Sequence, residues 1–301
     1  MATRSSWSSS INKTDKKYSF DEAKKIVIDA LSVLGDKYVK NLKKAFDEKW
    51  IDIYHSKGKR SGAYSSGNFD VNPYVLLNFE GTLNDVSTLA HELGHSMHTY
   101  LSCKNNPYQY SSYEIFVAEV ASTVNELLLA NYMLKNSKNK EEKLAVINHI
   151  LDLYKATLYR QTMFAEFEKE THKLREKGEV LTSDLLSNTY YNLVKKYFGP
   201  NVLCDDLIKY EWARIPHFYY NFYVYKYATG ISAASYIVDG ILNNKEGALE
   251  NYINFLKTGG SMYPLDELKI AGVNLNSKSV VLSAIKTFEK YLKEFKDIYN
   301  S

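Results

Sequence analysis

Hydrophobic positions along this chain recur mainly with a helical period. Apolar residues stand three and four positions apart over long stretches, with Lys and Glu between them, which is typical of amphipathic helices. Glycine and proline interrupt this pattern at only a few places. The pattern predicts helices over Phe20–Val33, Tyr38–Ile53, Tyr113–Leu134, Glu141–Lys177, Ser183–Tyr197, Lys245–Lys257 and Ser277–Tyr299, with one more inside residues 218–242.

One region lacks the helical period. Residues 55–72 are rich in Gly, Ser and Asn and read as a flexible polar loop. After Pro73, the segment Tyr74–Phe79 is short, rich in β-forming residues and bounded by turn residues, so we expect a strand there. The predicted fold class is therefore mainly α, a multi-helix domain with a small β element.

The amino-acid composition is that of an ordinary globular protein. The chain has 301 residues, is 45% hydrophobic and has a formal net charge of +3, so it can bury a sizeable core. Its charges are interspersed, which gives no support for nucleic-acid or membrane binding. The longest apolar runs, such as Leu127–Ala130, are far too short to span a bilayer. Cys103 and Cys204 read as reduced thiols, which favours the cytoplasm.

The chain shows few signs of subdivision. Residues 1–17 are rich in Ser, Thr and Lys and lack the apolar stretch of a secretory signal, so we expect them to be disordered or foreign to the natural chain. No Pro/Gly/Ser-rich linker divides the rest. Residues 18–301 are accordingly predicted to be a single helical domain.

The strongest chemical signal is an H-E-x-x-H motif in the helix that follows the strand. Thr82, Asn84 and Asp85 offer caps for this helix. His91 and His95 are four apart and therefore share one helix face, where both can bind one Zn²⁺. Between them, Glu92 is placed to act as general base toward the attacking water.

A catalytic zinc needs a third protein ligand. Glu119, 28 positions after His91 in the next predicted helix, is the best candidate. A helical Glu is usually a solvated surface residue, but the apolar flanks of Glu119 predict burial, and a buried carboxylate needs a partner. Gly94 would let the two helices approach closely. We therefore expect one Zn²⁺ per chain, held by His91, His95 and Glu119.

Two neighbouring residues have more than one interpretation. His98 lies two turns after His91, beyond reach of the same metal, and is interpreted as a packing or substrate-side residue. Glu126 shares a helix face with Glu119 and could accept the second ring N–H of a ligand histidine. A surface position is the competing interpretation of Glu126.

Three segments carry a resemblance to a known family. The segments Asp85–His98, Phe116–Thr123 and Ile215–Gly230 resemble, in order and spacing, the M3 family of zinc metallopeptidases, specifically the oligoendopeptidase F branch. The resemblance implies a zinc-peptidase catalytic domain that cleaves internal bonds of short oligopeptides in a deep, narrow channel. It also implies that the strand Tyr74–Phe79 forms the channel edge and pairs with extended substrate.

In this family, a His- and Tyr-rich segment stabilises the oxyanion of the reaction. The resemblance points to Tyr220 and Tyr227, with His217 on the substrate carbonyl or backbone. As a helix, the segment places His217, Tyr220 and Tyr227 on one face. As a strand, it would instead align the side chains of a different set, Tyr219, Tyr223 and Tyr225.

The resemblance covers only the C-terminal, metal-binding half of the family's length. One alternative function is therefore a catalytically impaired zinc-binding half that needs a partner chain. A second is a carboxypeptidase of the angiotensin-converting type, which shares the helical zinc architecture. The partners expected are oligopeptide substrates, with either a dimer or a complementing N-terminal segment.

Overall fold

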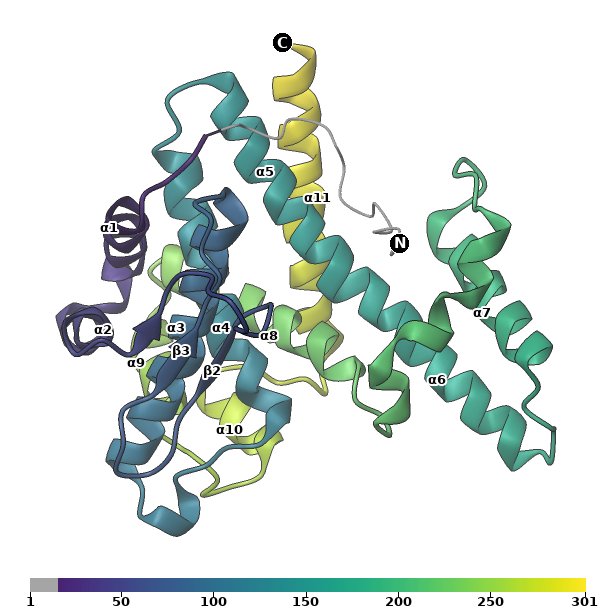
Figure 1. Ribbon diagram of the computed structural model, residues 1–301, viewed down its shortest axis with the longest axis horizontal. Coiled ribbons are helices and arrows are strands. Elements are labelled where there is room, and N and C mark those ends of the chain that lie inside the picture. The colour runs from purple at the N-terminus through teal and green to yellow at the C-terminus, as the bar shows by residue number, and fades with distance from the viewer. Residues whose placement is uncertain (1–15) are drawn as a thin grey trace. The chain divides into compact units, whose positions relative to one another are not determined.

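The computed structural model describes residues 16–301 and is mainly helical, as predicted (Figure 1). These residues form eleven α-helices and one small sheet. They divide into two compact units: the first runs up to Asp152 and resumes over Gly230–Ser301, and the second is Leu153–Thr229. The predicted segment 1–17 lies almost wholly outside the described residues. The interpretation of residues 18–301 as one catalytic domain stays a prediction.

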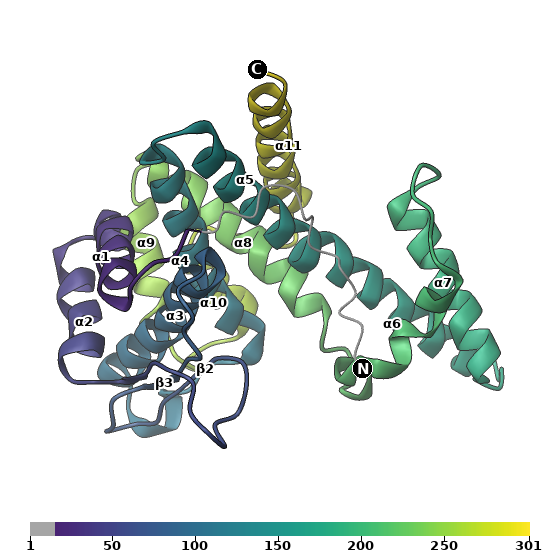
Figure 2. The ribbon, with the colours of Figure 1, turned by 45° about the horizontal axis from the view of Figure 1, so that its top comes forward.

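The first unit is built around two long helices, α3 and α4, which lie side by side in Figures 1 and 2. Helix α4 is buried on nearly every side, which explains why its sequence is apolar all round. Helices α1 and α2 and the sheet pack against this pair. The helices of this unit are α1 (Phe20–Ala30), α2 (Asp36–Asp47), α3 (Leu83–Asn105), α4 (Ile115–Lys135), most of α5 (Lys140–Tyr154), α8 (Tyr225–Leu242) from Gly230 on, α9 (Ala248–Phe255), α10 (Pro264–Ile270) and α11 (Lys278–Asn300).

Helix α3 begins at a well-defined cap. The Thr82 side chain accepts a hydrogen bond from the Asp85 backbone N–H, and the Asp85 carboxylate accepts one from the Thr82 backbone N–H. This reciprocal pair satisfies two N–H groups that the first helical turn leaves free. The cap therefore fixes where the helix starts, and with it the rotation of the face that carries the motif.

The sheet has three short strands: β1 (Ile51–Asp52), β2 (Tyr64–Ser66) and β3 (Tyr74–Leu76). Their order is β1-β3-β2, with β3 parallel to β1 and antiparallel to β2. Over Tyr74–Leu76, β3 is paired on both sides, so this part of the strand has no free edge for the substrate backbone that the resemblance implied would pair with it. Strand β2, inside the predicted polar loop, is the edge strand nearer to α3.

Helix α2 is shorter than predicted. It ends at Asp47, and Lys49 takes a positive φ of 56°, which breaks the helical path. Trp50, 2% exposed, turns into the core, and Ile51 begins the first strand. The apolar residues at 50 and 51 continue the helical period by coincidence, so the periodicity alone extends the helix too far.

The second unit is a small helical assembly around its own core. It contains a π-helical turn (Lys155–Tyr159), α6 (Arg160–Glu176), α7 (Ser183–Phe198) and the 3₁₀ segments Asp206–Arg214 and Pro216–Tyr219. Its buried core consists of Met163, Phe164, Phe167, Tyr190, Leu193, Val194, Ile215 and Val224. In the described part of the chain, no helix is long and apolar enough to cross a membrane.

Candidate metal centre

The candidate site lies where α3 and α4 come closest in the first unit. At Gly94, a Cβ atom would stand 2.6 Å from the Ser122 Cα and 2.7 Å from the Ala121 carbonyl oxygen, so only glycine fits. The Asn125 side-chain amide donates to the Ala90 carbonyl at 3.0 Å. This contact ties the helices together one turn before Gly94. The close approach expected from Gly94 is confirmed.

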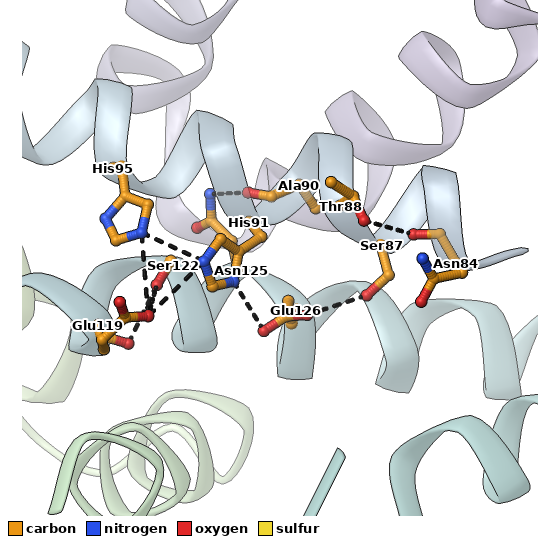
Figure 3. A network of polar contacts seen from close by, with 10 residues as sticks. All are labelled: Asn84, Ser87, Thr88, Ala90, His91, His95, Glu119, Ser122, Asn125 and Glu126. Carbon is orange, nitrogen blue, oxygen red and sulfur yellow. Dashed lines mark hydrogen bonds and ion pairs between the residues drawn. The ribbon is translucent and has the colours of Figure 1, made fainter. Parts of the chain in front are cut away.

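The three predicted ligands converge on one point (Figure 3). His91 Nε2 and His95 Nε2 are 3.2 Å apart, and Glu119 Oε2 lies 3.6 Å from the first and 3.9 Å from the second. A tetrahedral zinc ion with bonds near 2.0–2.1 Å holds its ligand atoms roughly 3.3–3.4 Å apart. The donor set and its spacing therefore fit zinc, with a fourth position left for water or substrate.

A second layer of contacts orients the ligands. His91 Nδ1 lies 3.0 Å from Glu126 Oε2, and the Ser87 hydroxyl donates to Glu126 Oε1 at 3.2 Å. Hydrogen-bonded carboxylates of this kind fix the ring orientation of a ligand histidine and raise its basicity. Of the two interpretations of Glu126, the structure supports the contact with one of the candidate ligand histidines, His91, over a free surface position.

The electrostatic field at this point favours a positive charge. Burial alone would lower the pKa of His91, but the carboxylates around it, Glu126 first, raise the value to about 9. Burial and the neighbouring His91 lower the pKa of His95 to about 3, so the His95 ring is neutral near pH 7. A neutral imidazole is the form that binds a metal. A cation between these groups would satisfy the surrounding carboxylates.

Glu92 occupies a different environment from the ligands. Its side chain is 6% exposed, and its Oε2 atom is buried without a hydrogen-bond partner among the described residues. Burial raises the pKa of Glu92 to about 7, although the charge of His91 and the Ser65 backbone N–H act in the opposite direction. A carboxyl group with a pKa near neutrality can both accept and return a proton.

Strand β2 is fastened to the motif helix beside Glu92. The Ser65 and Ser96 hydroxyl oxygens are 2.8 Å apart, and Ser96 donates to the Glu92 carbonyl at 2.9 Å. Because Ser96 uses its one proton there, Ser65 is the donor in the first contact. No pattern in the sequence points to these serines, because Ser65 lies in the segment interpreted as a flexible polar loop.

His98 is a packing residue. It is fully buried, and its ring stacks on Tyr113 with centroids 3.6 Å apart. The Tyr113 hydroxyl in turn contacts the Thr99 hydroxyl at 2.9 Å. Of the two interpretations of His98, the structure supports packing over contact with substrate.

The predicted oxyanion residues belong to the second unit. The Tyr227 hydroxyl lies 3.4 Å from His217 Nε2, whereas Tyr220 is 63% exposed. Neither regular interpretation of this segment is correct, because a 3₁₀ turn ends at Tyr219 and α8 begins only at Tyr225. This irregular backbone places Tyr223 beside His217, and the two rings stack with centroids 5.3 Å apart. The roles of His217, Tyr220 and Tyr227 stay predictions.

Comparison with known proteins gives relatives over nearly the whole chain. Oligopeptidase PepF of Bacillus subtilis is 48% identical over 282 residues, which cover 94% of this chain and 42% of that protein. A crystal structure described as a peptidase from Chlamydophila abortus superposes with a TM-score of 0.86 at 48% identity, over 95% of this chain and 48% of that one. The oligoendopeptidase-F structure from Enterococcus faecium gives a TM-score of 0.71 at 36% identity, over 95% and 47% of the two chains.

The chain thus spans about half the length of the relatives it matches. The sequence profile of Peptidase family M3 matches residues 9–287, a range that contains the motif, the third candidate ligand and the tyrosine-rich segment. Together with relatives of the oligoendopeptidase F type and a helical fold shared with them, this match shows that the chain belongs to Peptidase family M3.

Proposed function

We propose that this chain carries the active centre of a zinc-dependent endopeptidase that hydrolyses internal bonds of short oligopeptides. The observation that carries the proposal is the convergence of His91, His95 and Glu119 beside the buried Glu92. The family and the names of the relatives, oligopeptidase and oligoendopeptidase, support the substrate class. When bound, zinc supplies polarisation of the scissile carbonyl and a lowered pKa for the attacking water.

Glu92 supplies the acid–base chemistry in this proposal. Its unpaired Oε2 is available to take a proton from the attacking water and then to pass it to the leaving amine. Burial raises the pKa of this carboxyl group above its usual value, which favours its holding the proton until the amine leaves. Glu126 keeps the His91 ring in position while this happens, because it holds the ring nitrogen that faces away from the ligand cluster.

Substrate backbone would pair with β2 rather than with β3. Strand β2 stands at the edge of the sheet, and its Ser65 is tied to α3 beside Glu92. An extended peptide added to this edge would gain main-chain hydrogen bonds with little dependence on sequence. The proposal keeps the predicted mode of substrate binding and moves it to the neighbouring strand.

The oxyanion role is proposed for His217, Tyr220 and Tyr227. A developing negative charge needs preorganised donors, and a phenol in contact with an imidazole is such a donor.

A cytoplasmic location also belongs to the proposal, supported by two cysteines that form no disulfide.

The test is a quenched fluorogenic peptide assay on the zinc-loaded chain and its Glu92→Gln variant. We expect Glu92→Gln to lower kcat/KM by roughly 10²–10⁴-fold, since the general base is lost. A chelator should abolish turnover, and added zinc should restore it. Turnover that survives both treatments would remove the mechanism.

A second candidate, left open by the sequence, is a zinc-binding half that needs a partner chain for turnover; the relatives matched are about twice as long as the aligned region. Stoichiometric zinc without hydrolysis, followed by hydrolysis when the remaining half of a relative is added, would identify this case. Cleavage of C-terminally amidated peptides separates both candidates from a carboxypeptidase, which requires the free carboxylate.

A further inference from the structure

One aromatic residue in the second unit has an unusual backbone conformation. Phe222 has a φ of 49°, in the left-handed region that bulky side chains rarely adopt. It lies between the 3₁₀ turn Pro216–Tyr219 and the start of α8. Because such a conformation is unfavourable by itself, surrounding contacts must hold it.

Two residues of α6 make these contacts. A carboxylate oxygen of Glu168 accepts a hydrogen bond from the Phe222 backbone N–H, and the His172 ring stacks on the Phe222 ring with centroids 4.4 Å apart. Glu168 and His172 are four positions apart, so they project from the same helix face. One turn of α6 therefore holds both the main chain and the side chain of Phe222.

Glu168 is an unusual residue to find inside this unit. It is 5% exposed and lies on the helix whose Met163, Phe164 and Phe167 form the core. Burying a carboxylate is costly unless a hydrogen bond compensates for it. The Phe222 N–H provides such a bond, which gives the buried Glu168 a specific task at this turn.

The residues next to Phe222 carry the predicted oxyanion chemistry. Tyr223 stacks on His217 and lies 5.9 Å, between ring centroids, from Tyr227, whose hydroxyl reaches His217 Nε2. The direction of the chain at Phe222 decides where the Tyr223 ring points. The turn therefore controls the packing of the whole His217–Tyr223–Tyr227 ring cluster.

We propose that Glu168 is a positioning residue that holds the Phe222 turn and thereby orders the His217–Tyr223–Tyr227 cluster. Its importance for turnover rests on the function proposed above for His217 and Tyr227. The effect of Glu168 on the order of the loop around Phe222 does not depend on that function.

Loop order can be measured without any turnover. Tyr219, Tyr220 and Phe222 are all exposed by 45% or more, so chymotrypsin, which cleaves after aromatic residues, reports on the mobility of this loop. The exposed Tyr263 in the first unit serves as an internal reference site. We expect Glu168→Ala to speed loop cleavage by roughly 10-fold, because the left-handed turn then loses its main-chain hydrogen bond and keeps only the His172 stack. Glu168→Gln, whose amide oxygen still accepts the N–H, should stay near the wild-type rate, as should Glu170→Ala on the same helix.

A second pair of variants acts at the half-exposed loop position and spares the core. Phe222→Asn and Phe222→Val both lose the stack on His172, but asparagine tolerates positive φ and a β-branched residue does not. We expect Val to give the faster loop cleavage. Equal rates for Val and Asn, or a wild-type rate for Glu168→Ala, would overturn the proposal.

The kinetic readout separates this proposal from the proposed function. In the zinc-loaded chain, Glu168→Ala should lower kcat and leave KM and zinc content unchanged, as expected when an interaction made in the transition state is weakened. Absence of chelator-sensitive turnover in the wild-type chain would count against the proposed function alone. The chymotrypsin rates would still decide the role of Glu168.

Discussion

At the scale of single residues, the surroundings decide which histidines of α3 can bind a metal. His91 and His95 face the Glu119 carboxylate across a short gap, while His98, on the same helix, is buried against the Tyr113 ring. Helical spacing already puts His98 two turns from His91, out of reach of the same metal. The position of α4 then brings the Glu119 carboxylate to the other two histidines.

Glu267 provides a residue-scale prediction about pH. It is fully buried with neither carboxylate oxygen hydrogen-bonded among the described residues, and burial, aided by the Glu114 charge, raises its pKa to about 7. Because the folded pKa lies above the ordinary value of 4.5, the folded state prefers the protonated form. The stability that this group contributes is complete below about pH 4.5 and is lost as the pH rises through about 7.

We therefore compare the free energy of unfolding of Glu267→Gln with that of the wild type. The difference, variant minus wild type, should rise by up to about 3 kcal/mol between pH 5 and pH 8. Urea unfolding at a series of pH values measures this difference. Glu114→Gln serves as the control and should remove only a small part of the pH dependence. Parallel curves for wild type and Glu267→Gln would contradict the argument.

At the scale of elements, the sequence predicts the long helices and strand β3, and it misses strands β1 and β2. Helices α7 and α11 (Lys278–Asn300) keep a helical period over many residues, so their existence follows from local pattern. Strands β1 and β2 have two and three residues, too few to show an alternation, and they form only because β3 pairs with them.

The candidate site divides in the same way. The spacing of His91 and His95 is a local property of a helix, and Glu119 could be chosen from its apolar flanks. Ser65 and Tyr223, in contrast, reach their partners through chain turns that leave no periodic signal. Residues on irregular segments were therefore missed or assigned to the wrong face.

Gly94 tests the contact between the two central helices. In most helices, Gly→Ala stabilises by up to about 1 kcal/mol. Here the added Cβ would meet backbone atoms of α4 at 2.6–2.7 Å, so we expect Gly94→Ala to destabilise by about 1–3 kcal/mol and to weaken zinc binding.

Gly240→Ala in α8 is the matched control. The atoms nearest to its added Cβ belong to side chains, first Ala248 at 3.3 Å, so its effect on the free energy of unfolding should be much smaller. Urea unfolding and zinc titration of both variants make the comparison. Equal effects at the two glycines would show that the approach of α3 to α4 is not constrained at Gly94.

At the scale of the whole molecule, the candidate metal centre and the tyrosine-rich segment belong to different compact units. His91, Glu92, His95 and Glu119 lie in the first unit, and the His217–Tyr223–Tyr227 cluster lies in the second. The candidate metal centre lies within one unit, since α3 and α4 supply all three proposed ligands. Zinc binding should therefore depend on the first unit alone, whatever turnover requires.

The most direct test of this account is zinc stoichiometry and affinity, measured by elemental analysis and competitive titration for the wild-type chain, Glu119→Gln and Glu126→Gln. We predict one zinc per wild-type chain, a site largely lost in Glu119→Gln, and an affinity weakened roughly 10–100-fold in Glu126→Gln, whose side chain only supports His91. Full zinc occupancy with unchanged affinity in Glu119→Gln would contradict the central claim that α3 and α4 together form the metal centre.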